Sequence, residues 1–192
     1  MRLGPTILVV AGCSGVGKSA TMRMLACLNR RFAQVMPFIT SKLRPHEMDK
    51  IHVTESRLAR LEMQGALLQV NSLYGARYGT PLEPFLRWQD RGLIPMLDWP
   101  IQWVAELQRR FAGRVFSVYI EPTSAAVLQQ RLVADGRDAD GRRLQAAVAE
   151  LRLLKAGSFD GLIDLHLVAR DGAIDNLART VQNAFLRAAG RQ

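Results

Sequence analysis

The chain has 192 residues, 48% of them hydrophobic, which is enough for one domain with a sizeable core. No apolar run approaches the roughly 20 residues that a transmembrane helix needs. Two cysteines are too few for a disulfide framework, and no Cys or His cluster has the spacing of a zinc site. We therefore expect a cytoplasmic protein without membrane partners and without a disulfide between Cys13 and Cys27.

The formal net charge of +9 predicts attraction to anions such as nucleotides, nucleic acids or acidic surfaces. The basic residues are spread along the chain. No basic stripe is interleaved with aromatic residues, as single-strand nucleic-acid binders often show. The charge therefore favours phosphate-binding pockets, with nucleic-acid binding as the less favoured alternative. It gives no indication of the oligomeric state.

The most specific motif lies near the N-terminus. Residues 12–19 read G-C-S-G-V-G-K-S, which matches the phosphate-binding pattern G-x-x-x-x-G-K-[ST]. Residues 6–11 before it are apolar and partly β-branched, as in a buried parallel strand. Residues 19–28 after it are good helix formers without Gly or Pro. The sequence thus predicts the strand, loop and helix that the motif requires.

This motif predicts an ATP site with Mg²⁺. Glycines allow the backbone N–H groups and the helix N-terminus to point at phosphates. Lys18 adds a positive charge at the β and γ oxygens, and the Ser19 hydroxyl is the expected Mg²⁺ ligand. The predicted ATP-binding residues are Gly12, Ser14, Gly15, Gly17, Lys18, Ser19 and Ala20.

Helices and strands alternate along the rest of the chain. Residues 40–49 are polar and predict a loop or a short strand, and Thr54 is placed to cap a helix over 55–64. Further along, the sequence predicts strands at 66–70, 93–98, 115–120 and 162–168, turns at 74–81, a charged loop at 135–143, and helices at 84–91, 101–111, 124–133, 144–155 and 174–189.

This alternation predicts an α/β fold in which helices flank a parallel sheet. Residues 38–89 interrupt the alternation and are numerous enough for a small inserted subdomain that binds the acceptor. The charged loop at 134–144 is the expected short lid. The prediction is therefore one domain with its core at 1–37 and 90–192.

Over nearly its whole length the chain resembles the guanylate kinase family of P-loop nucleoside monophosphate kinases. The loop is similar to that family's G-P-S-G-x-G-K-[ST], with Cys13 at the proline position. Residues 40–47, T-S-K-L-R-P-H-E, resemble T-T-R-x-P-R-x-G-E with one residue fewer. The resemblance implies that Lys42 and Arg44 hold the acceptor phosphate, although a lysine lacks the bidentate geometry of an arginine.

Two further segments resemble the acceptor site. Residues 75–80, G-A-R-Y-G-T, are similar to G-N-Y-Y-G-[ST], which implies that Tyr78 donates to the acceptor phosphate and that Thr80 contacts the base. Leu97 and Asp98 are similar to the strand-end motif L-x-[IV]-D, which implies that Asp98 lies near Mg²⁺ or the acceptor. The alternative role for Asp98 is to cap the following helix.

The lid resembles the family's R-L-x-G-R-G at Arg131 and at residues 136–137, but it is shorter. The resemblance implies that Arg137 is catalytic, together with either Arg142 or Arg143. Such arginines stabilise charge on the transferring phosphoryl group. Arg143 is our assignment, although the residues alone do not separate it from Arg142.

Base recognition is where the chain departs from the family. The family's guanine-binding Glu position holds Gln69, which offers one neutral acceptor in place of a carboxylate. The acidic position after Asp98 holds Pro100, and Lys50 or Ile51 stands where the family has a phosphate-binding tyrosine.

The resemblance implies ATP-dependent phosphoryl transfer to a phosphorylated acceptor, a nucleotide or a sugar phosphate, with GMP first. One alternative is a kinase for an acceptor without guanine, such as ribose 1,5-bisphosphate. The other is a non-catalytic guanylate-kinase-like binding or regulatory domain. The intact residues 17–19 argue against the latter, since a binding module has no need of a triphosphate site.

Overall fold

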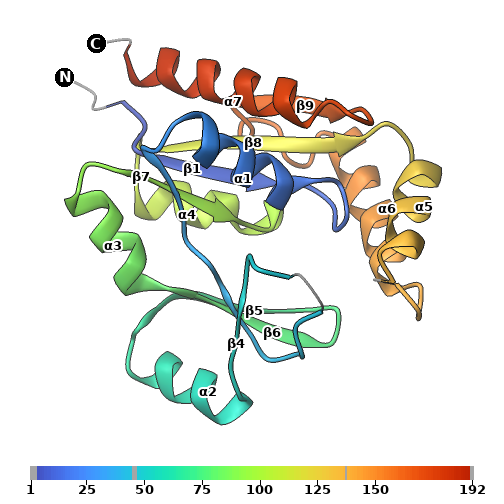
Figure 1. Cartoon of the computed structure of the whole chain (residues 1–192), viewed down its shortest axis with the longest axis horizontal. Coiled ribbons are helices and arrows are strands. Elements are labelled where there is room, and N and C mark those ends of the chain that lie inside the picture. The colour runs from blue at the N-terminus through green and yellow to red at the C-terminus, as the bar shows by residue number, and fades with distance from the viewer. Residues whose placement is uncertain (1–3, 45–46, 137, 191–192) are drawn as a thin grey trace.

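The computed structural model describes residues 4–44, 47–136 and 138–190. Its main sheet has five strands in the order β2-β7-β1-β8-β9, and all four pairings are parallel (Figure 1). The strands are β1 (Ile7–Ala11), β2 (Phe32–Gln34), β7 (Ile94–Asp98), β8 (Val115–Pro122) and β9 (Leu165–Ala169). The predicted α/β class with a parallel sheet flanked by helices is confirmed.

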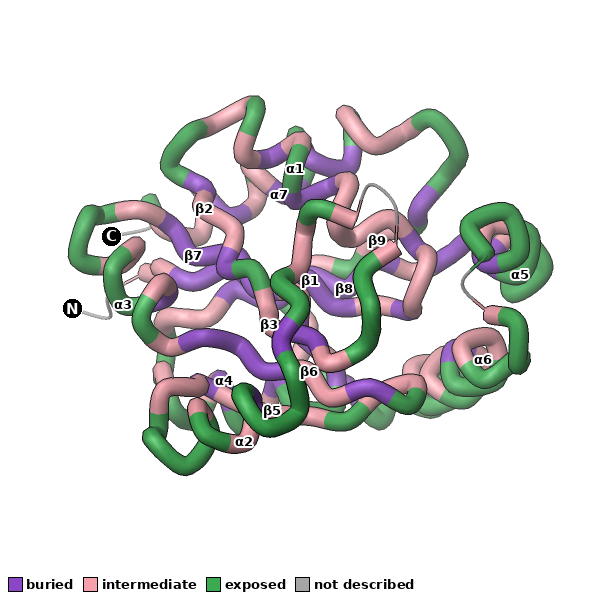
Figure 2. The backbone as a smooth tube through the Cα atoms, turned by 60° about the horizontal axis from the view of Figure 1, so that its bottom comes forward, coloured by how far each residue is buried: buried purple, intermediate pink, exposed green. Residues whose placement is uncertain are grey.

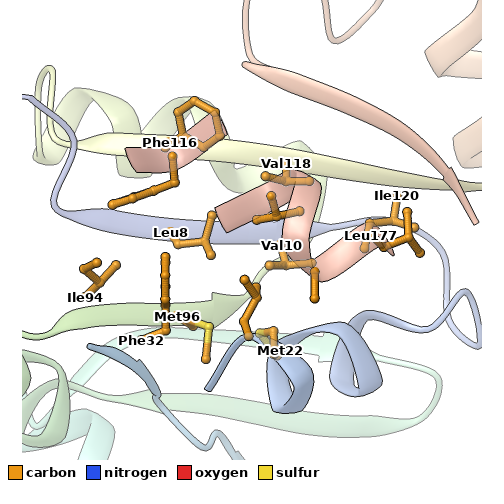
Figure 3. Close-up of a cluster of buried hydrophobic side chains, with 14 of the residues drawn as sticks. Leu8, Val10, Met22, Phe32, Ile94, Met96, Phe116, Val118, Ile120 and Leu177 are labelled. Atoms are coloured by element: carbon orange, nitrogen blue, oxygen red, sulfur yellow. The ribbon is translucent and has the colours of Figure 1, made fainter. Parts of the chain in front are cut away.

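The central strand β1 is buried on both faces. Leu8 and Val10 belong to one core cluster, which also takes residues from α1 (Lys18–Leu28) and α7 (Ile174–Ala189) (Figure 3). Ile7 and Val9 belong to the opposite cluster, which is covered by α3 (Leu82–Asp90) and α4 (Val104–Arg110). Burial on both sides explains why the strand is an unbroken apolar run.

A second sheet with the strand order β4-β3-β6-β5 lies below the main sheet in Figure 1. Strands β5 and β6 form an antiparallel hairpin. The elements are β3 (Phe38–Ile39), β4 (Ile51–His52), α2 (Glu55–Met63), β5 (Leu67–Leu73) and β6 (Ala76–Pro81). Thr54 caps α2 by accepting from the backbone N–H of Arg57, as the sequence predicted. The assignment of residues 38–89 to an acceptor-binding subdomain stays a prediction.

The prediction of turns at 74–81 was wrong, because residues 76–81 form β6, which pairs with both β3 and β5. Only Tyr74 and Gly75 make the turn. The glycine and proline of this strand weaken its local signal, and pairing with residues distant in sequence decides its conformation. Strands β2, β3 and β4 were not predicted, since two or three residues carry no detectable periodicity.

Helices α5 (Ala125–Ala134) and α6 (Arg142–Lys155) project from the C-terminal half and are largely exposed, whereas β1, β7 and β8 are mostly buried (Figure 2). Helix α6 begins two residues before the predicted start. The carboxylate of Asp138 accepts from the backbone N–H groups of Arg143 and Leu144, at 2.7 and 2.9 Å. The first turn of α6 is therefore capped from the preceding loop.

The short 3-10 helix η1 (Ile101–Trp103) precedes α4. Its N-cap is Pro100, so the alternative role of Asp98 as a helix cap is not what the structure shows. In the described part of the chain, no helix is both long enough and apolar enough to cross a membrane.

Candidate active site

A large open cavity of about 1170 Å³ lies between the two sheets. One wall is the loop before α1, a second is the insert sheet, and a third is one face of α6. The strand-ending Asp98 of β7 lies at the same site, where the carboxyl ends of parallel strands meet. This arrangement brings the P-loop motif and the insert together in one cavity.

At Gly12 the loop before α1 packs closely against the backbone of β8. Gly12 has φ = 133°, and a Cβ at this residue would lie 2.3 Å from the carbonyl oxygen of Ile120. Helix α1 begins at Lys18, its N-cap Gly17 offers no side-chain hydrogen bond, and its first turn has no acidic residue. Its N-terminal N–H groups are therefore open to an anion from the cavity.

Lys18 is held at the base of this loop. Its Nζ donates to the backbone oxygens of Gly12 and Cys13 at 2.7 and 3.0 Å, and lies 3.7 Å from Oδ1 of Asp98. The Asp98 carboxylate thus faces the P-loop lysine across the cavity floor. A bound phosphate would meet Lys18 as a preorganised donor.

A chain of charged side chains links the insert to the P-loop. Ser19 donates to Asp49 Oδ2 at 2.5 Å, and Lys50 Nζ lies 3.3 Å from the same oxygen. Lys50 also donates to Glu47 Oε1 at 2.8 Å, and Arg44 Nη2 donates to that oxygen at 2.7 Å. All five side chains line the cavity.

These pairings shift the pKa values of the carboxylates. Burial alone would raise the pKa of Glu47, but hydrogen bonds from Arg44 and Lys50 outweigh it and hold the pKa at about 2. Burial opposes ionisation of Asp49 too, yet the Ser19 hydroxyl and Lys50 keep its pKa below its ordinary value. The network is therefore fully charged near neutral pH.

Most of the predicted acceptor residues share this cavity. Its lining includes Lys42, Arg44, Tyr78, Thr80 and Asp98. Tyr78 and Thr80 lie on β6, which pairs with β3. The cationic insert loop, which carries Lys42, Arg44 and Lys50, follows β3 in the chain.

Gln69 is not among the lining residues. It pairs with Thr80 across the hairpin, and its Oε1 is buried without a hydrogen-bond partner in the described structure. Asn71, two residues further along β5, does line the cavity, and its Oδ1 is in the same unpartnered state.

The predicted lid arginines differ in whether they face the cavity. Arg143 lines the cavity, and its Nη1 donates to Ser14 Oγ at 2.9 Å. Arg142 is two-thirds exposed and pairs with Asp140. Arg131 pairs with Asp171 at 2.5 Å, and its Nη1 donates to the backbone oxygen of Val16 in the P-loop at 3.5 Å. Arg137 lies outside the described residues.

The donor set fits ATP with Mg²⁺. The seven predicted ATP-binding residues all line the cavity around the open start of α1. The described residues contain no group of three or more His, Cys, Asp or Glu that could enclose a metal ion. The Ser19 hydroxyl at the start of α1 suits a Mg²⁺ whose other ligands come mostly from phosphates and water.

Among the cavity residues that sequence reasoning missed are Asp49, Lys50, Asn71 and Tyr74. Lys50 was noted only as a replacement for a tyrosine. The sequence did hold one indication: Glu47, Asp49 and Lys50 place opposite charges within four residues, and such a run often has paired side chains. Nothing in the local sequence indicated Asn71 or Tyr74.

A family profile described as guanylate kinase matches residues 4–184. The chain belongs to the guanylate kinase family. It is 35% identical over 163 residues to the guanylate kinase of Nitratidesulfovibrio vulgaris, covering 82% of this chain and 77% of that protein.

A guanylate kinase of Rhizobium johnstonii is 29% identical over 137 residues, which span 70% of this chain but only 62% of that relative. The crystal structure of guanylate kinase from Anaplasma phagocytophilum matches with a TM-score of 0.75 at 20% identity, covering 100% of this chain and 89% of that one. At this identity the structural match bears on the fold alone. The match to guanylate kinases thus extends over both sheets and the P-loop.

Proposed function

We propose that this member of the guanylate kinase family transfers the γ-phosphoryl group of ATP to a phosphorylated acceptor, most directly GMP, yielding GDP. The observation that carries the proposal is the cavity shared by the P-loop and the cationic insert loop. One side offers N–H donors and Lys18 for a triphosphate. The other offers Lys42, Arg44 and the Tyr78 hydroxyl for a second phosphate.

Phosphoryl transfer mainly requires that the protein positions the two substrates and stabilises their negative charge. Lys42, Arg44 and Tyr78 would hold the acceptor so that its phosphate oxygen faces the γ-phosphorus in line. Lys18 and Arg143 would neutralise the charge that spreads over the transferring group. No general base is needed, since an acceptor phosphate is already anionic at pH 7. Mg²⁺, when bound at Ser19, would supply further positive charge for the donor phosphates.

A second acceptor class has its own supporting observation. The amide of Gln69 cannot accept both hydrogen bonds that a guanine edge donates, whereas a carboxylate can. Lys50 also lines the cavity, where it pairs with Glu47 and Asp49. An acceptor without guanine, such as ribose 1,5-bisphosphate, suits this composition.

A coupled ADP-release assay with ATP and Mg²⁺ tests both candidates. The acceptors are GMP, dGMP, AMP, CMP, UMP and ribose 1,5-bisphosphate. Turnover confined to GMP and dGMP supports a guanylate kinase. Turnover only with another acceptor keeps the mechanism and reassigns the substrate. ATP binding without turnover on any acceptor contradicts the proposal and favours a binding or regulatory domain.

A further inference from the structure

The tip of the β5–β6 hairpin carries an unusual backbone conformation. Tyr74 has φ = 55°, and among the described residues it is the one non-glycine with a positive φ. A bulky side chain in this region costs free energy and persists only where its surroundings fix it. The neighbouring Gly75 accommodates its own φ of 76° without that cost.

The Tyr74 ring packs against the start of α6. The guanidinium carbon of Arg143 lies 4.3 Å from the ring centroid, which is a close cation–π contact. A Cβ built on Gly75 would lie 3.8 Å from Nη1 of Arg142. The hairpin tip of the insert therefore lies against the first turn of this helix.

Arg143 is also held from two other directions. Its Nη1 donates to the hydroxyl of Ser14 in the P-loop at 2.9 Å. Its backbone N–H donates to Asp138 at 2.7 Å, which fixes the helix start from which the side chain extends. Tyr74 is thus the contact through which the insert touches the arginine that faces the P-loop.

We propose that Tyr74 is a positioning residue, whose ring holds the Arg143 guanidinium over the P-loop. The inference rests on the proposed function, in which Arg143 neutralises charge on the transferring phosphoryl group. A long arginine side chain has many rotamers. The ring restricts these rotamers while the guanidinium keeps its positive charge. The insert that binds the acceptor thereby also orients a cation toward the donor phosphates.

Two variants separate the ring from the backbone. Asn tolerates a left-handed backbone, so Tyr74→Asn removes the ring without adding strain. We expect its kcat to fall about tenfold, with little change in the acceptor KM and no loss of thermal stability. Tyr74→Phe keeps the ring and should retain kcat within about twofold. An unchanged kcat in Tyr74→Asn, or an equal loss in Tyr74→Phe, overturns the proposal.

A double-mutant cycle tests whether Tyr74 acts through Arg143. The combined variant Tyr74→Asn/Arg143→Ala should be no slower than Arg143→Ala alone. Losses that simply multiply would show that the two residues act independently, and would contradict a positioning role.

A measurement on the nucleotide-free protein does not depend on activity. The ring should move the Arg143 Hδ resonances upfield, assigned by their loss in Arg143→Lys, and the shift should vanish in Tyr74→Asn but stay in Tyr74→Phe. A wild-type protein without this shift overturns the positioning role. If the shift is present but wild type phosphorylates no acceptor, the contact stands while the proposed function, and with it the catalytic purpose of the contact, fails.

Discussion

Several polar side chains of the cavity already have hydrogen-bond partners within the protein. A bound substrate must either displace these partners or add its own hydrogen bonds to them. Lys18 is bonded to two carbonyl oxygens, Ser19 to Asp49, and Arg143 to Ser14. These contacts keep the polar groups of the cavity satisfied and oriented. By contrast, Gln69 and Asn71 each present a buried amide oxygen with no partner in the described structure. A buried polar atom without a partner is costly, which makes Asn71 a candidate for ligand contact, since it lines the cavity whereas Gln69 does not.

Gln69 does not line the cavity, but the family resemblance places the base-binding residue at this position. On that assignment Gln69→Glu is expected to raise kcat/KM for GMP by about tenfold, since a carboxylate accepts two charge-assisted hydrogen bonds from guanine. The gain should be absent with AMP and CMP, as measured by initial rates of ADP release. Gln64→Glu, at the exposed end of α2, is the matched control and should change nothing. An unaltered preference for GMP would show that residue 69 does not reach the base.

The two cysteines should differ strongly in reactivity. Neither is in a disulfide; Cys27 is exposed, whereas Cys13 is buried. Burial, aided by the nearby Glu150, raises the pKa of the Cys13 thiol to about 12. Since the thiolate is the reactive form, a disulfide exchange reagent should titrate one thiol rapidly in the native protein and none in Cys27→Ser. Rapid reaction of both thiols would contradict the buried P-loop cysteine.

Among the elements, the insert loop at 41–50 and the start of α6 both depend on carboxylates. Glu47 holds Arg44 and Lys50 together, and Asp138 caps α6 from outside the helix. Each carboxylate fixes a segment with little apolar burial of its own. Such segments gain order mainly from charge-assisted hydrogen bonds.

Glu47→Gln should lower the free energy of unfolding at pH 7 by about 1–3 kcal/mol. The folded pKa of about 2 lies below the ordinary value of 4.5, so the carboxylate stabilises the protein fully above pH 4.5. This contribution is lost as the pH falls toward 2, and the two proteins should converge there. Urea unfolding from pH 2 to 7 measures the difference, with the exposed Glu83→Gln as control. A difference independent of pH would rule out the paired carboxylate.

Asp138→Ala should destabilise the protein by about 1 kcal/mol, because two N–H groups in the first turn of α6 lose their acceptor. Asp140→Ala removes an exposed neighbour whose carboxylate pairs only with Arg142 in the described contacts, so it should cost well under half as much. Thermal unfolding of both variants makes the comparison. Equal losses would show that Asp138 does not act as the cap.

At the scale of the whole molecule, the sequence predicted the core better than the insert. The P-loop strand, α1 and α7 carry long, strong local patterns, and α7 was predicted with its observed bounds. Strand β6 was missed because its conformation depends on pairing with two distant strands.

The candidate site likewise has a part that the sequence predicts well and a part that it does not. The P-loop residues follow from one contiguous motif, so sequence alone brings them together. The contact between Tyr74 and Arg143 joins residues 69 positions apart, and the cavity lining of Asn71 depends on the register of a hairpin. Interactions of this kind come from packing between elements, which no local pattern encodes.

The central claim is phosphoryl transfer from ATP to an acceptor phosphate. Phosphorus NMR of the protein with ATP, Mg²⁺ and GMP follows the transferred group directly, with Lys18→Ala as the control. We expect GDP and ADP to appear in equal amounts as GMP and ATP decline, and no detectable GDP with Lys18→Ala. ATP that stays intact, or that yields only ADP and inorganic phosphate with every phosphorylated acceptor tried, would contradict the account.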